Sequence, residues 1–78
     1  MVHKRIAIDP KIMFGKPVIK GTRIPVELIL RKLGAGMTEE QLMIHHPHLS
    51  AKDIKAAMSF AADHLANEEI TLASGDSL

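Results

Sequence analysis

Apolar residues recur with helical spacing in two long stretches of this chain. The first stretch carries Val26, Ile29, Leu30 and Leu33, and the second carries Ile54, Ala57, Met58, Ala61 and Leu65. Positions separated by three or four residues lie on one face of an α-helix. The pattern therefore predicts two amphipathic helices, each with one face directed at a core.

Residues that start and stop helices set the limits of these two helices and add a third between them. In chain order the start and stop residues are Pro25 and Gly34, Thr38 and Pro47, and Ser50 and Asn67. Pro25 suits a first helical position, because its missing N–H would be unpaired there in any case. Thr38 and Gln41 form a capping box, which predicts a short helix over about residues 39–46. Ser50 is the predicted cap of the last helix.

Residues 1–25 have no helical spacing. Apolar runs at 6–8, 12–14 and 18–19 are separated by prolines, glycines and polar residues. Short runs between such residues predict strands of two to four residues joined by turns. The sequence therefore predicts a mainly α fold, in which a three-helix helix-turn-helix bundle follows a short N-terminal β-hairpin arm. By pattern alone, any other small three-helix bundle remains an alternative.

The length of 78 residues corresponds to one domain. We expect a single helix-turn-helix domain over 1–69, with the β arm over 1–25, and a flexible tail over 70–78. With no cysteine and only two aromatic residues, the core must be small and aliphatic, so self-association is an expected source of stability. No apolar run reaches the length of a membrane span, and no secretory signal is recognisable, so we expect a cytoplasmic protein that does not bind membranes.

The charges are distributed unevenly although the net charge is only +1. Residues 1–32 hold eight of the ten Lys and Arg residues against two acids, which gives +6, whereas residues 33–78 carry −5. A basic segment attracts phosphate groups or an acidic protein surface. Solvated charges that merely fall unevenly along a short chain are the alternative. We favour a partner, because the basic segment has little helical character.

A phosphate-binding loop is the first specific site that the basic segment suggests. Such a loop needs Gly-Lys-Ser/Thr at the start of a helix, but here Lys20 precedes Gly21 and strand-like residues surround both. Glycines that permit a positive φ angle in turns explain the same run. We therefore predict no nucleotide site and no cofactor.

Three histidines, His45, His46 and His48, lie close together in the sequence. Helical metal ligands need a spacing of three or four residues, but His45 and His46 point about 100° apart and Pro47 separates His48 from both. Histidines near a helix C-terminus also interact favourably with its negative end. We predict no metal site and leave the role of this cluster open.

Catalysis has little support in the sequence. Glu39, Glu40 and Asp53 fall in the first turns of predicted helices, where acids interact favourably with the helix dipole. Ser50 is a cap and has no recognisable base beside it. We therefore do not expect an enzyme.

Two apolar residues, Leu28 and Phe60, lie off the apolar stripes of their helices. A second apolar face on a small bundle belongs either to a broader core or to an interface, and both interpretations remain open. Lys52, Lys55 and Ser59 are the candidate DNA-facing residues of the last helix. This helix lacks Arg before residue 67, so the basic arm would have to supply much of any phosphate contact.

One long run carries a family resemblance. Ile8-Asp9-Pro10 is followed by Gly15-Lys16-Pro17-Val18-Ile19-Lys20-Gly21-Thr22-Arg23-Ile24-Pro25-Val26, and later by Pro47-His48-Leu49-Ser50. These segments resemble the signature of domain-of-unknown-function family 433, over about residues 6–65. The resemblance implies a homeodomain-like helix-turn-helix protein of a kind often encoded beside small PIN-like nucleases and regarded as their antitoxins. His46 departs from the family, which usually has an aromatic residue before this proline.

The resemblance implies a partner whose site holds Mg²⁺ among carboxylates. Arg23 could pair with those carboxylates, or it could serve structure only, by pairing with a local acid. The candidate partner- or phosphate-binding residues are Lys16, Lys20, Thr22 and Arg23. We expect an antitoxin-type protein that neutralises a PIN-like nuclease, binds operator DNA to regulate its own expression, and forms homo-oligomers. A stand-alone DNA-binding regulator and a homodimeric interaction module without nucleic acid are the alternatives.

Overall fold

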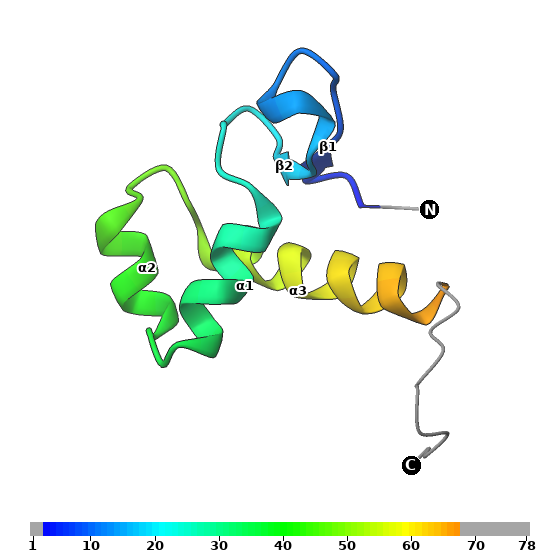
Figure 1. Cartoon of the computed structure of the whole chain (residues 1–78). Coiled ribbons are helices and arrows are strands. Elements are labelled where there is room, and N and C mark those ends of the chain that lie inside the picture. The colour runs from blue at the N-terminus through cyan, green and yellow to red at the C-terminus, as the bar shows by residue number, and fades with distance from the viewer. Residues whose placement is uncertain (1–2, 68–78) are drawn as a thin grey trace.

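The computed structural model describes residues 3–67 as three helices that follow a small two-stranded sheet (Figure 1). In chain order the elements are β1 (Ile6–Ala7), a 3₁₀ turn η1 (Met13–Gly15), β2 (Val18–Ile19), α1 (Val26–Gly34), α2 (Glu39–His45) and α3 (Ala51–Ala66). The prediction of a mainly α fold with three helices and an N-terminal β arm is confirmed. The tail predicted over 70–78 lies outside the described residues.

The arm is an antiparallel pair of strands capped by a compact loop. Ile6 pairs with Ile19 and Ala7 with Val18. The strand predicted over 12–14 is wrong. The backbone N–H of Gly15 donates to the Ile12 carbonyl at 3.1 Å, which curls the chain into η1. The β-propensity of residues 12–14 gives no indication of this turn, in which Met13 and Phe14 both have positive φ angles.

The helix ends follow the predicted signals closely. Pro25 is the N-cap of α1 rather than its first residue, because its extended backbone still bridges to Val18. Thr38 caps α2 in the predicted capping box, since its hydroxyl accepts from the Gln41 N–H while the Gln41 side chain accepts from the Thr38 N–H. The helix ends at His45, one residue before the predicted end.

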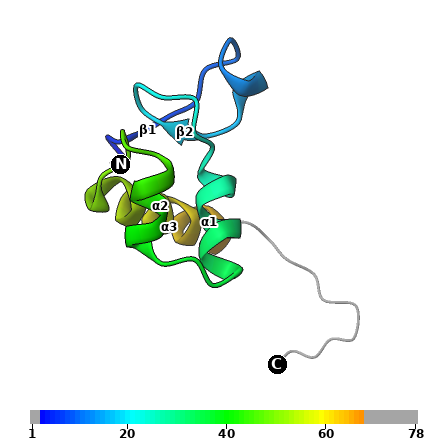
Figure 2. The same ribbon diagram turned by 90° about the vertical axis from the view of Figure 1, so that its left-hand side faces the viewer.

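The core lies where the three helices meet the strand β2 (Figure 2). Its buried side chains are Val18, Ile19, Val26, Ile29, Leu42, Leu49, Ile54 and Ala57. The apolar stripe predicted for α3 is buried only in part. Ile54 and Ala57 lie in the core, whereas Met58 is 38% exposed and Leu65, where α3 extends past the other helices (Figure 1), is 57% exposed. Within the described residues, no helix is long and apolar enough to span a membrane.

Candidate binding groove

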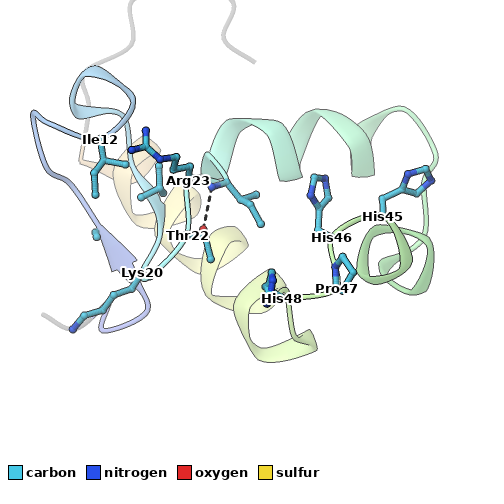
Figure 3. Close-up of a pocket in the computed structure, with 12 residues that line it drawn as sticks. Ile12, Lys20, Thr22, Arg23, His45, His46, Pro47 and His48 are labelled. Atoms are coloured by element: carbon cyan, nitrogen blue, oxygen red, sulfur yellow. Dashed lines mark hydrogen bonds between the residues drawn. The ribbon is translucent and has the colours of Figure 1, made fainter.

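A groove of about 950 Å³ separates the turn after β2 from the connection between α2 and α3 (Figure 3). We call it the basic groove. Its lining residues are Ala7, Ile12, Val18, Lys20, Gly21, Thr22, Arg23, Ile24, His45, His46, Pro47 and His48. Two permanent cations and three histidines thus line one space, and no carboxylate is among the described residues that line it.

The arm side of the basic groove is a tight turn held by its own hydrogen bonds. The Thr22 N–H donates to the Ile19 carbonyl at 2.9 Å, and Gly21 supplies the positive φ of +83° that such a turn needs. The Thr22 hydroxyl donates to the same carbonyl at 2.7 Å and accepts from the Ile24 N–H at 3.0 Å. The only donor of this hydroxyl is therefore engaged, so Thr22 shapes the turn that presents Lys20 and Arg23.

The helix side of the basic groove is the end of α2. The His46 N–H donates to the Leu42 carbonyl at 2.9 Å, and Pro47 then prevents another helical turn. The Leu49 N–H donates to the His46 carbonyl at 2.8 Å, and the Leu49 side chain is buried in the core. The connection is therefore anchored at both ends, and it holds the three histidines opposite the arm (Figure 3).

Lys20 and Arg23 are exposed, and within residues 3–67 neither side chain forms an ion pair or a hydrogen bond. Lys16, the third predicted cation, does not line the basic groove. Its Nζ lies 3.2 Å from an Oε1 of Glu27, and this hydrogen bond, followed by the Lys16 charge and the nearby Arg31, lowers the pKa of Glu27. The structure therefore brings together Lys20, Thr22 and Arg23 and leaves Lys16 elsewhere.

The sequence interpretation missed that the histidines line the same groove as Lys20 and Arg23. The positions of these histidines near the C-terminus of a helix do not indicate which residues lie across the groove. No local sequence signal could therefore have predicted that the histidines line it. Within the described residues, no cluster of histidines and acids could hold a metal ion. The groove is thus suited to an anionic group rather than to a cation.

A second missed feature holds the arm against α3. Arg5 Nη1 donates to Asp53 Oδ1 at 2.9 Å, and the other carboxylate oxygen accepts from the Ser50 N–H at 3.0 Å. Burial of the Asp53 carboxyl raises its pKa, but the Ser50 N–H and the Arg5 guanidinium together outweigh burial, so the pKa of Asp53 is lowered. His3 adds a contact to Asp63 at 2.9 Å. These contacts fix the arm, and with it the arm side of the basic groove.

The other candidate residues lie away from the basic groove. Lys52, Lys55 and Ser59 are exposed on α3. Phe60 is half-buried, packs against the core and meets the ring of His3 at a centroid distance of 5.2 Å. Leu28 is half-buried on α1.

These observations define a small helical domain whose β arm and α2–α3 connection enclose a basic groove. The family model described as "Protein of unknown function (DUF433)" matches residues 6–61, and the chain belongs to this family.

One solved structure and two other proteins are similar to this chain. A crystal structure of a DUF433 member from Anabaena variabilis superimposes with a TM-score of 0.75 at 29% identity, covering 80% of this chain and 61% of that one. The uncharacterized protein y4eO of Sinorhizobium fredii is 34% identical over 56 residues, which are 72% of this chain but 25% of that protein. An uncharacterized protein of Archaeoglobus fulgidus is 61% identical over 28 residues, 36% of this chain and 78% of that protein. The chain therefore spans a quarter of the length of the first relative.

Proposed function

We propose that this chain is an antitoxin-type protein that binds and neutralises a small PIN-like nuclease, and that the basic groove is the binding site. The observation that carries the proposal is that Lys20 and Arg23 have no acidic partner within residues 3–67, and that they and three histidines line a groove with no carboxylate among its described lining residues. The family resemblance supports the choice of partner.

The chemistry of the two surfaces is complementary. A nuclease of this kind holds Mg²⁺ in a cluster of carboxylates, so its site is acidic when the metal is absent. The planar guanidinium of Arg23 can pair with one carboxylate through two parallel N–H···O bonds, and Lys20 adds a second positive charge three residues away. Binding would then compete with Mg²⁺ for the same carboxylates and stop hydrolysis.

The experiment recovers the proteins that co-purify with the tagged chain from its native extract and measures inhibition of a PIN-like nuclease among them by the purified chain, with the Kd from calorimetry. The double variant Lys20→Glu with Arg23→Glu should weaken binding by about 100-fold or more, because two attractions become repulsions. The matched control is Lys52→Glu with Lys55→Glu, which makes the same charge change on exposed positions of α3. Equal inhibition by all three proteins would refute the proposal.

Autoregulation through DNA is a second proposed activity, supported by the exposure of Lys52, Lys55 and Ser59 on α3. Phosphate contacts release counterions, so log affinity should fall linearly with log salt, by a slope of about −0.9 for each phosphate neutralised. Lys52→Glu with Lys55→Glu should make the slope shallower by about 2, and Lys20→Glu with Arg23→Glu should make it shallower as well, since the basic arm is expected to supply much of the phosphate contact. A slope near zero for the unmodified chain would exclude DNA binding.

A further inference from the structure

A second groove of about 230 Å³, which is almost entirely apolar, lies between the start of α1 and the last turns of α3. We call it the apolar groove. The residues that matter to its shape and charge are Pro17, Glu27, Leu30, Phe60, Ala61 and Leu65. Leu65 is 57% exposed, and the Phe60 ring meets the His3 ring in a T-shaped contact at 5.2 Å and stacks on His64, which also lines the groove, at 6.0 Å. None of the described residues that line it also line the basic groove.

The same chain carries an apolar knob of matching size. Phe14 is 97% exposed at the tip of the arm, although it is one of only two aromatic residues in the chain. Its position is fixed, since the Lys16 N–H donates to the Met13 carbonyl at 3.1 Å and Phe14 itself has a left-handed backbone with φ of 57°. A non-glycine residue held in this conformation with its ring in water is costly unless the ring has another use.

We propose that the apolar groove receives Phe14 of a second copy of this chain, so that two copies form a two-fold dimer with two identical contacts. The groove has room for a phenyl ring, since a cavity of about 150 Å³ holds benzene, and Phe60 lines it as an aromatic neighbour. The contact is apolar, because Glu27, which also lines the groove, is already paired with Lys16 and Arg31 of its own chain.

The placement of knob and groove on one edge of the molecule favours closure of the dimer. Pro17 lines the apolar groove and is only three residues from Phe14. Because the knob and the groove lie this close together, a two-fold rotation can place the arm of each copy at the groove of the other. Contacts that reciprocate in this way close as a dimer instead of continuing as a filament. The proposal does not rest on the nuclease partner, because it uses the other groove.

Sedimentation equilibrium of the full chain from micromolar to millimolar concentration tests the dimer. The mass should rise from 8.6 kDa toward twice that value with concentration. Phe14→Asp should raise the dimer Kd by at least about 100-fold, since it removes one buried ring from each of two contacts. Ile44→Asp is the matched control, because Ile44 is 75% exposed on α2 and lies outside the apolar groove; its Kd should stay unchanged.

A mixing experiment separates the proposed contact from any other association. Ala61→Trp fills the groove but keeps the knob, whereas Phe14→Asp keeps the groove but lacks the knob. Each variant alone should be monomeric with an intact helical circular dichroism spectrum, and their mixture should form a heterodimer through one remaining contact, weaker than the parent dimer. A parent chain that stays monomeric at 1 mM, or a Phe14→Asp variant that dimerises as well as the parent, would overturn the proposal; the first result leaves the groove to another occupant.

Discussion

Two pairs of cations in the arm have different surroundings that the sequence does not distinguish. Arg5 and Lys16 each contact a carboxylate of a helix, Asp53 in α3 and Glu27 in α1. Lys20 and Arg23 have no ion pair within residues 3–67 and line the basic groove. The first pair stabilises the fold and the second is available to a partner, so a charge count over residues 1–32 overstates what a partner would meet.

The difference between the groups comes from where the arm touches the helices. Arg5 precedes β1, which packs against α3, and this contact brings the guanidinium to the first turn of α3. Lys20 and Arg23 lie in the turn that leads away from β2 and line a groove whose other side, at the end of α2, carries histidines instead of acids. Lys and Arg residues therefore have different roles according to where each lies in the arm relative to the helices.

Loss of Asp53 should give the largest effect on stability. Asp53→Ala removes the carboxylate that binds Arg5 and also removes one half of the capping box with Ser50. We expect the free energy of unfolding to fall by about 3 kcal/mol, measured by urea denaturation. Asp53→Asn, which keeps an oxygen for the Ser50 N–H, should lose less. A loss below about 1 kcal/mol for the alanine variant would show that apolar contacts alone hold the arm.

The ion pair itself should account for a smaller part of that loss. A double-mutant cycle with Arg5→Met and Asp53→Asn isolates the coupling between the two side chains. Because the Arg5 side chain is 47% exposed and is screened by solvent, we expect a coupling of about 1 kcal/mol. Additive losses from the two variants would mean that the pair contributes no coupling, and that Asp53 acts through its cap only.

The contribution of the Asp53 carboxylate to the free energy of unfolding should also be measurable in the parent chain, by lowering the pH. Since the pKa of Asp53 is lowered in the folded chain, this group stabilises the fold at pH above its ordinary pKa of 3.8, and the contribution is lost as the pH falls through the lower folded value. The free energy of unfolding of the parent should therefore decline more steeply below pH 4 than that of Asp53→Asn. Parallel pH profiles would contradict the lowered pKa.

The extent to which sequence predicted this structure depends on how far apart the interacting residues lie. The Thr38 cap was predictable because its partner is three residues away. The Arg5–Asp53 pair spans 48 residues, and the sequence showed only an acid near a helix start. The strand predicted over 12–14 failed for a related reason, since hydrogen bonds around the run, rather than its apolar residues, determine the turn.

The candidate site shows the same limit. Lys20, Thr22 and Arg23 lie in one short turn, so the sequence could group them, and the family resemblance selected the same run. The histidines of the opposite wall are more than 20 residues away along the chain. Their approach depends on how α2 packs beside the arm, which no periodicity or motif records. One wall of the basic groove was thus predictable and the other was not.

The smallest effect on stability should come from the cations that line the basic groove. Lys20→Ala and Arg23→Ala remove exposed side chains that contact no acid within the described residues, so each should change the free energy of unfolding by no more than about 0.5 kcal/mol. The same urea denaturation used for Asp53→Ala gives the comparison directly. If Arg23→Ala instead destabilised the chain by more than about 1 kcal/mol, Arg23 would belong with Arg5 as a structural cation. Stability close to that of the parent, together with weakened binding of the nuclease, would mean that the arm uses one pair of its cations to fold and keeps another for its partner.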